Sequence, residues 1–373
     1  MSDVPHLRFP EFSGEWEECS IQDFGEVVTG NTPPTSHAEY YENGSYLWAS
    51  PADLGINKNI TETKTKLSLS GFKKTRNIPK GSVLVTCIGS TIGKMGMATE
   101  TMSSNQQINS IVVNGKSNSD FVYYAICRAF PRYLSEVGVQ AVPILSKSNF
   151  EKLPNYTTCR EEQDKIGYFL NLLDERIATQ NKIIEDLKLL KSAIAETVFN
   201  NMKGHLTNLS AICSIVKGKQ VNGEELSEKG KYYVMNGGIT PSGYYDQCNT
   251  PANTISISEG GNSCGYVQYN KSSFWSGGHC YTLQDISSGV ETQYLFHYLK
   301  RYESNIMKLR IGTGLPNIQK KDLENFRIVL PPSNVQKEIA TCLTAIEHKI
   351  LVEINWLDSV QKEKQHLLHQ MFI

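Results

Sequence analysis

The chain has 373 residues, a formal charge of −1 from 37 basic and 38 acidic side chains, and nine cysteines. This length accommodates two domains of about 130 to 150 residues plus helices. With so little net charge, binding to a nucleic acid would require local basic patches. An odd cysteine count without a CxxC pair argues against a disulfide framework or a zinc ribbon. No apolar run reaches membrane length and the polar start is not a signal peptide, so we expect a cytoplasmic protein.

The first clear element is a strand followed by a tight loop. Ser82 to Thr86 alternate as in a half-buried strand, and the loop Gly89-Ser90-Thr91-Ile92-Gly93 follows. The loop lacks GxGxxG spacing, and no GxxxxGK[ST] string occurs in the chain, so it is a weak phosphate-binding motif. Two interpretations stay open: glycines that a tight turn requires, or a loop that contacts a nucleic acid directly.

Polar residues cluster around this strand and loop. Three closely spaced basic residues and one after the loop form the densest basic stretch of the first half, and a run of amides can hydrogen-bond adenine edges. Each could equally be a solvated loop residue. Together they favour a surface for a polar ligand over a small apolar pocket. The candidates are Lys73, Lys74, Arg76, Ser90, Thr91, Lys94, Asn105 and Gln106.

A long helix is predicted from Arg160 to Asn200. Apolar side chains recur there at alternating intervals of four and three residues, at eight of ten positions, with Gln180 and Lys191 as the polar exceptions. Only Gly167, near the start, interrupts the helix formers, so the stretch forms a rod of roughly 60 Å at about 1.5 Å per residue. These periodic positions form the predicted seam, the narrow side of the helix that packs against a partner helix. Its apolar residues are Ile166, Leu170, Leu173, Ile177, Ile184 and Leu187.

The second half repeats the strand and the loop. Thr254 to Ser258 alternate, and the loop from Gly261 to Gly265 follows at an offset of 172 residues from its counterpart. Ile215 to Gly218 resembles Val27 to Gly30 at an offset of 188, so the second domain is shorter by about sixteen residues between these landmarks. Candidate binding residues are Lys217, Lys219, Tyr244, Asn262, Tyr266 and His279, of which the aromatic ones could also be core residues.

The chain ends in a second copy of the long helix. Residues 142 to 199 and 315 to 372 keep one register, 173 positions apart, without net insertion, as Gln163 and Gln336 illustrate. Such a domain-sized period indicates an internal duplication. The seam again has eight apolar positions of ten, with Glu353 and Lys364 as the polar exceptions at matching places. The predicted seam residues are Ile339, Leu343, Ile346, Ile350, Leu357 and Leu367.

The matching polar positions favour pairing of the two helices with each other, although each could instead pack on its own domain. Short connections require the second helix to run back antiparallel, which places the globular regions at opposite ends of a rod with an approximate two-fold axis. The expected fold is α+β: two mixed α/β domains, residues 1–158 and 202–331, joined by helices at 159–201 and 332–373 in an antiparallel coiled coil. His366 and His369 share a helix face but lack a third ligand, so no metal site is predicted.

Several segments resemble the specificity subunits of type I restriction-modification systems. These are LRFPEFSGEWEE, IPKGSVLVTCIGSTIGKMG with SSNQQINSIVV, GLPNIQKKDLENFRIVLPP, and the paired EEQDKIGYFLNLLDERI and VQKEIATCLTAIEHKI. The resemblance implies that each globular region is a target recognition domain for one half of a split, asymmetric sequence in double-stranded DNA. It also implies that the helices set the gap and dock two methyltransferase (modification) subunits, alongside restriction/translocase subunits.

The chain is not expected to be an enzyme. Adenine methylation requires an [ND]PP[FYW] loop, and the nearest strings, Thr32-Pro33-Pro34 and Leu330-Pro331-Pro332, lack the amide or carboxylate. Walker elements are also missing from the sequence. We therefore expect no cofactor on this chain, with S-adenosylmethionine and ATP used by the partner subunits. A scaffold that does not bind DNA, with two binding modules on a coiled-coil spacer, is the main alternative, and an enzyme is the third.

Overall fold

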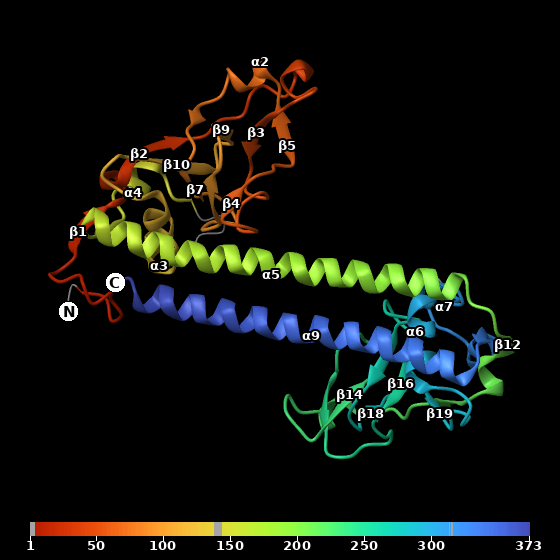
Figure 1. Cartoon of the computed structure of the whole chain (residues 1–373). Helices are drawn as coiled ribbons and strands as arrows, with labels where there is room; N and C mark the ends of the chain where they lie inside the picture. Colours follow the sequence, from red (N-terminus) through yellow and green to blue (C-terminus); the bar gives the residue numbers. More distant parts are fainter. Residues whose placement is uncertain (1–3, 138–143, 313, 315) are drawn as a thin grey trace. The chain divides into compact units, whose positions relative to one another are not determined.

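The computed structural model describes residues 4–137, 144–312, 314 and 316–373. Positions 142, 143 and 315, at the start of the sequence repeat, lie outside these ranges. The chain divides into two compact units, Met1–Lys182 with Asn355–Ile373, and Ile183–Ile354. The long helices α5 (Arg160–Asn200) and α9 (Ser333–Gln370) each contribute to both units (Figure 1). We call these the first and the second unit.

The first unit contains a five-stranded sheet in the order β2-β10-β7-β8-β4, a four-stranded sheet β5-β3-β9-β6 and the pair β1-β11. Its strands are β1 (Glu17–Ser20), β2 (Gly25–Thr29), β3 (Tyr46–Ala49), β4 (Asn59–Ile60), β5 (Thr65–Leu67), β6 (Asn77–Ile78), β7 (Val83–Thr86), β8 (Met95–Ala98), β9 (Met102–Ser104), β10 (Ile108–Val113) and β11 (Pro154–Thr157). Its shorter helices are α1 (Ile21–Phe24), α2 (Leu69–Phe72), α3 (Ser119–Val137) and α4 (Lys147–Glu151).

The second unit contains a four-stranded sheet in the order β13-β19-β16-β17, a three-stranded sheet β15-β14-β18 and the pair β12-β20. Its strands are β12 (His205–Asn208), β13 (Ser214–Lys217), β14 (Tyr232–Met235), β15 (Gly243–Tyr245), β16 (Thr254–Ser258), β17 (Val267–Asn270), β18 (Trp275–Ser276), β19 (Cys280–Gln284) and β20 (Arg327–Leu330). Its shorter helices are α6 (Thr292–Arg301), α7 (Glu303–Met307) and α8 (Lys320–Glu324). Strands β7 and β16 confirm the two strands predicted from alternation.

The two units share one topology. The order β2-β10-β7-β8 matches β13-β19-β16-β17, and β5-β3-β9 matches β15-β14-β18. The parallel pairs β3 with β9 and β14 with β18 also correspond, and the first unit has a further parallel pair, β4 with β8. The first unit adds β4 and α2 in the segment where the second is about sixteen residues shorter, while the pairing of β6 with β9 at Ile78 and Met102 recurs as the bridge between Thr250 and Phe274. The duplication therefore extends through the whole globular domain.

A helix covers one face of the larger sheet in each unit. In the first, Phe121 and Phe130 of α3 belong to the same buried cluster as Val83 and Val85 of β7. In the second, Leu295 and Leu299 of α6 pack with the apolar residues of β16. Burial of such side chains contributes about 1.5–3 kcal/mol each, which makes these clusters the main source of stability in each domain.

The N-terminal segment is attached to the helices of the first unit. Arg8 donates from Nε and Nη2 to the two carboxylate oxygens of Glu162, at 2.7 Å each, and the Glu162 side chain is fully buried. The backbone N–H of Leu7 donates to the carbonyl of Gln370 at 2.9 Å. Because a buried carboxylate is stable only when paired, this bidentate contact fixes the segment on the start of α5.

Two repeat-related glutamines connect the long helices to their domains. Gln163 accepts a hydrogen bond from the Asn118 N–H at 2.9 Å and donates to the Thr158 carbonyl at 2.8 Å. Gln336 accepts from the Glu291 N–H and donates to the Pro331 carbonyl, both at 2.9 Å. Both glutamines are buried. The matching contacts explain why this amide recurs in the sequence repeat.

The two long helices contact each other through a repeated ion pair. In the first unit Lys364 Nζ lies 2.5 Å from Asp174 Oδ1, and in the second Lys191 Nζ lies 3.2 Å from Glu347 Oε2. The offset of 173 residues converts one pair into the other. In the first unit Arg176 lies over the ring of Trp356, at 4.6 Å, so higher numbers on α5 meet lower numbers on α9. The predicted antiparallel pairing is therefore confirmed within each unit.

The side of each helix that faces its partner is narrow. Between Ile177 and Lys191, the seam positions are buried or half-buried while every other residue is exposed. All twelve apolar residues predicted for the seams are buried or half-buried. At the polar exceptions Lys191 and Lys364, the ammonium reaches a carboxylate on the other helix. Within the described part of the chain, no helix is long and apolar enough to cross a membrane.

Candidate nucleic-acid interface

One edge of the larger sheet gathers polar side chains in both units. In the first, β2 and β7 end where β8 and β10 begin, with Thr29 opposite Asn109 and Thr86 opposite Ile108. In the second, Lys217 lies opposite Tyr281 and Ser258 opposite Cys280. We call this edge the polar edge. It comprises residues 29–32, 87–94 and 104–107 in the first unit and residues 217–220, 259–266 and 276–279 in the second.

The glycine loops have the same backbone in both units. Gly89, Gly93, Gly261 and Gly265 all have φ between 76° and 94°, a region that favours glycine. The Gly93 N–H donates to the Thr86 carbonyl at 2.9 Å, and the Gly265 N–H donates to Ser258 at 2.8 Å. The turn therefore accounts for these glycines. Direct contact of the loops with DNA stays a prediction.

The basic residues of the first unit lie beside the end of β2. The side chain of Asn31 donates to the Lys74 carbonyl at 2.9 Å and accepts from the Arg76 N–H at 2.8 Å. Arg76 Nη1 in turn donates to the Thr29 carbonyl at 2.8 Å. Lys73, Lys74 and Arg76 are exposed, and they lie between α2 and β6. The basic cluster thus lies beside the first polar edge.

The remaining candidates of the first unit differ in exposure. Ser90, Lys94 and Gln106 are exposed and Thr91 is half-buried, all within the polar edge. Thr32 Oγ1 lies 2.6 Å from Gln106 Oε1, which leaves the Gln106 amide N–H₂ for another partner. Asn105 is buried, and its amide hydrogen-bonds Gln107. Its side chain therefore shapes the loop.

Three candidates of the second unit line a single cavity of about 510 Å³, namely Lys217, Asn262 and His279. Lys217 Nζ lies 2.5 Å from Glu259 Oε1, and His279 Nδ1 lies 3.6 Å from Glu259 Oε2. Glu259, Asn236 and Asn317 also line the cavity, and the sequence reasoning did not find them. The position of Glu259, directly after a buried strand and before two glycines, was the available signal.

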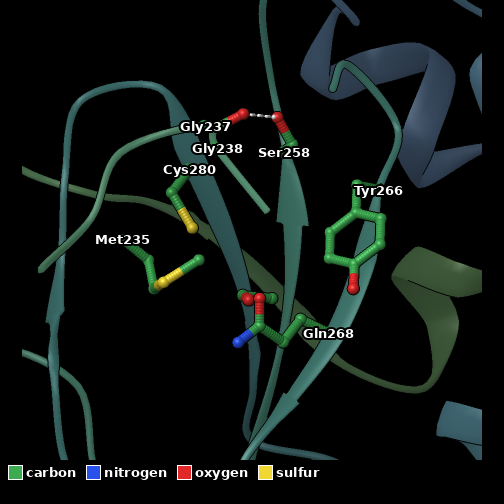
Figure 2. A pocket seen from close by; sticks show the side chains of 8 residues that line it. Met235, Gly237, Gly238, Ser258, Tyr266, Gln268 and Cys280 are labelled. Atoms are coloured by element: carbon green, nitrogen blue, oxygen red, sulfur yellow. Dashed lines mark hydrogen bonds between the residues drawn. The ribbon is translucent and has the colours of Figure 1, made fainter. Parts of the chain in front are cut away.

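The other candidates of the second unit have different surroundings. Tyr266 lines a small cavity of about 10 Å³, room for about one water. Ser258 Oγ donates to the Gly237 carbonyl there at 2.6 Å, the bond drawn as a dashed line in Figure 2. The Tyr266 ring is half-buried and lies under the Lys300 ammonium, 3.9 Å from its centroid. Tyr244 lies on β15 of the smaller sheet, outside the polar edge. Lys219 is exposed beside β18, where its N–H donates to Ser276.

Matching backbone hydrogen bonds align the two polar edges residue by residue. The Cys87 N–H donates to Gln107 at 2.8 Å, and the Glu259 N–H donates to His279 at 2.9 Å. The Gly30 N–H donates to Ile108, and the Gly218 N–H donates to Cys280. The equivalent positions are therefore Thr29 and Lys217, Cys87 and Glu259, and Gln107 and His279. The backbone is the same in the two edges, but the side chains differ.

These edges have the chemistry of a binding surface. They present amides, hydroxyls and ammonium groups, which hydrogen-bond phosphates and base edges. Among the described residues, no group of three His, Cys, Asp or Glu side chains could hold a metal ion. Fold and site thus define a class of protein: a duplicated α/β domain with two related but different polar binding edges, joined by paired long helices.

Comparison with known proteins identifies the family. Residues 13–189 and 206–359 match the model of the type I restriction modification DNA specificity domain. A putative type I specificity subunit of Mycoplasma genitalium is 30% identical over 46% of this chain and 45% of its own length. The specificity subunit of the type I restriction enzyme MjaIX of Methanocaldococcus jannaschii is 24% identical over 96% of this chain and 92% of its own. The chain thus spans about half the length of the Mycoplasma relative.

A solved structure shares the fold. The crystal structure of the S subunit of a type I restriction-modification system from M. genitalium covers 99% of both chains, with a TM-score of 0.73 and 19% identity. The chain belongs to the type I restriction-modification DNA specificity family, and it carries the specificity domain twice.

Proposed function

We propose that this chain is the DNA sequence-recognition subunit of a type I restriction-modification complex, with each domain reading one half of a split, asymmetric target. The observation that carries this proposal is the polar edge. One backbone frame occurs twice with different side chains, as at Cys87 and Glu259. Two different readers in one chain fit a target whose halves differ, whereas identical readers fit a palindrome.

The paired helices have two roles in this proposal. They set the gap between the half-sites, and they dock two methyltransferase subunits, to which restriction/translocase subunits are added. In support, large apolar side chains project from the helices outside the seam, including Leu189 at 64%, Leu190 at 50% and Leu351 at 45% exposure. Exposed apolar groups on a polar helix are typical of protein contacts.

The chemistry belongs to the partner subunits. S-adenosylmethionine and ATP bind to those subunits, and this chain contributes sequence selection without a cofactor of its own. The sequence supports this division, because the strings nearest to an adenine-methylation loop lack the amide or carboxylate. The complex then acts on DNA in the cytoplasm.

The decisive experiment is co-expression with the cognate methyltransferase, followed by mapping of methylated adenines by single-molecule sequencing. A split, non-palindromic motif with a constant gap is expected. Exchange of residues 1–158 for those of a relative should change one half-site and leave the other and the gap unchanged. A change in both halves would refute modular reading. A stable complex without any motif would favour the scaffold alternative.

A further inference from the structure

Polar residues and glycines make up most of the residues that line the cavity at the polar edge of the second unit. Its volume is about 510 Å³, and six side chains contribute charge, amide or imidazole groups. Pockets for small apolar ligands are instead lined mostly by hydrophobic residues. The six side chains are those of Lys217, Asn236, Glu259, Asn262, His279 and Asn317.

Glu259 occupies the centre of this arrangement. Its side chain is only 10% exposed, and Oε1 lies 2.5 Å from Lys217 Nζ and 3.2 Å from the Tyr281 hydroxyl. Burial, with the adjacent carboxylate, raises the pKa of Tyr281 to about 12, so its hydroxyl remains a donor. Among the described residues, none hydrogen-bonds Oε2, which is buried with His279 Nδ1 at 3.6 Å. The carboxylate of Glu259 is therefore largely enclosed, while the side chains around it line the cavity.

The two basic side chains around Glu259 remain accessible. The side chain of Lys217 is 52% exposed and that of His279 is 64% exposed. An ammonium has three donors, of which Glu259 takes one, so Lys217 keeps donors for a ligand. Asn236 Oδ1 accepts from the His279 N–H at 3.1 Å, which leaves the Asn236 N–H₂ available too. The cavity thus presents donors around a buried acceptor.

The charge balance between Lys217 and Glu259 indicates whether the ligand of this cavity is a phosphate or the edge of a base. A phosphate contact draws its strength from an uncompensated Lys or Arg charge, whereas the Lys217 charge is balanced by Glu259. A neutral group with two adjacent acceptors suits such a lysine better. Guanine offers this pair in the major groove, O6 and N7, and Lys or Arg on guanine is the commonest specific contact. Cytosine would instead need a free carboxylate oxygen, and both oxygens of Glu259 are enclosed.

The first unit has neither the lysine nor the glutamate of this ion pair at the equivalent positions. Thr29 takes the place of Lys217, Gln107 that of His279 and Cys87 that of Glu259. Cys87 is buried, and burial raises the pKa of its thiol to about 12, so the position is neutral. The two edges thus differ in the feature that selects a base.

We propose that this cavity selects a guanine in the half-site of the second domain, with Lys217 as the base-contacting residue and Glu259 as the residue that positions it. The inference rests on the proposed function, because it assigns a base to a domain that reads DNA. Glu259 acts through Lys217 and does not touch the base.

The test uses the full chain with its methyltransferase and measures methylation of targets carrying each of the four bases at every position of both half-sites. Lys217→Met should lower the preference for guanine at one position of one half-site by about ten- to hundredfold. That half-site should be the one that changes when residues 202–331 are exchanged. Lys217→Arg should retain the preference. Lys203→Met, at an exposed lysine of the same domain outside both the polar edge and the cavity, is the matched control and should leave the base preferences unchanged.

Glu259→Gln separates positioning from a merely structural role. It should weaken the same guanine preference, and the double variant with Lys217→Met should behave like Lys217→Met alone, because Glu259 acts through Lys217. If Glu259→Gln fails to fold, Lys217→Met, at a half-exposed position, decides the question. An unchanged motif with Lys217→Met, or a uniform loss at all sequences, would overturn the inference while the proposed function stands. A wild-type complex without any split motif would overturn both.

Discussion

At the scale of single residues, His297 of α6 gives the protein a pH-dependent stability. The side chain is buried, and Nε2 lies 2.9 Å from Thr344 Oγ1 on α9. Burial, with a smaller effect from the charge of Lys191, lowers the pKa of His297 from 6.5 to about 3. The folded protein therefore holds a neutral imidazole at the contact between α6 and α9.

The sign of the effect follows from the direction of this shift. Below pH 6.5 the unfolded chain takes up a proton that the folded chain does not bind until about pH 3. Stability from this group is thus complete above pH 6.5 and falls with pH below it, by at most about 1.4 kcal/mol per unit. We expect His297→Gln to remove this slope in urea unfolding, while His366→Gln, at an exposed position, keeps it. Equal slopes in wild type and His297→Gln would contradict the assignment.

The residues of the cavity differ in how well their role can be predicted from the sequence. The polar candidates Lys217, Asn262 and His279 were found from residue type and loop position, and the structure brings them to one cavity. Glu259 was missed because its role depends on the register of three strands that are distant in sequence, β13, β16 and β19. A carboxylate also looks unfavourable on a DNA-binding surface until its lysine partner is known.

At the scale of elements, the pairing of α5 with α9 depends on the seam and on a repeated ion pair. The pair Lys191 and Glu347 is partly exposed, at 22% and 45%, so its contribution is modest, about 1 kcal/mol or less. Lys191→Glu should destabilise the protein in urea unfolding, because it places two carboxylates together. The exchange Lys191→Glu with Glu347→Lys should recover most of that loss. Lys188→Glu, an exposed off-seam position on the same helix, is the control. Additive losses in the double variant would argue against this contact.

The helices were the most predictable elements, for a physical reason. A seam is a local sequence pattern, since each position follows the last by three or four residues. The bounds of α5, Arg160–Asn200, are those predicted from the sequence. The small sheet β5-β3-β9-β6 could not be predicted in this way. Its pairs join short strands such as β6 and β9, whose register is set by contacts between distant segments.

At the scale of the whole molecule, a formal charge of −1 means that attraction to DNA comes from a few exposed lysines and arginines. These groups fall into two kinds. Lys74 is exposed in the basic cluster beside the first polar edge, and among the described residues no carboxylate forms a salt bridge with it, whereas the Lys217 ammonium is paired with Glu259. A charge that neutralises a phosphate releases counterions, and each such contact adds about −0.9 to the slope of log K against log salt.

The two lysines should therefore respond differently to salt. Lys74→Met should weaken binding to all sequences alike and make the slope shallower by about 1, because one phosphate contact is lost. The double variant Lys217→Met with Glu259→Gln should leave the slope unchanged while it alters the base preference, because it removes both charges of a balanced pair. Fluorescence anisotropy of the assembled complex, on target and non-target duplexes over a salt series, measures both quantities. Lys188→Met, on the exposed side of α5, should change neither. Equal changes in slope for Lys74→Met and for this double variant would mean that both lysines bind phosphate and that the cavity does not select a base.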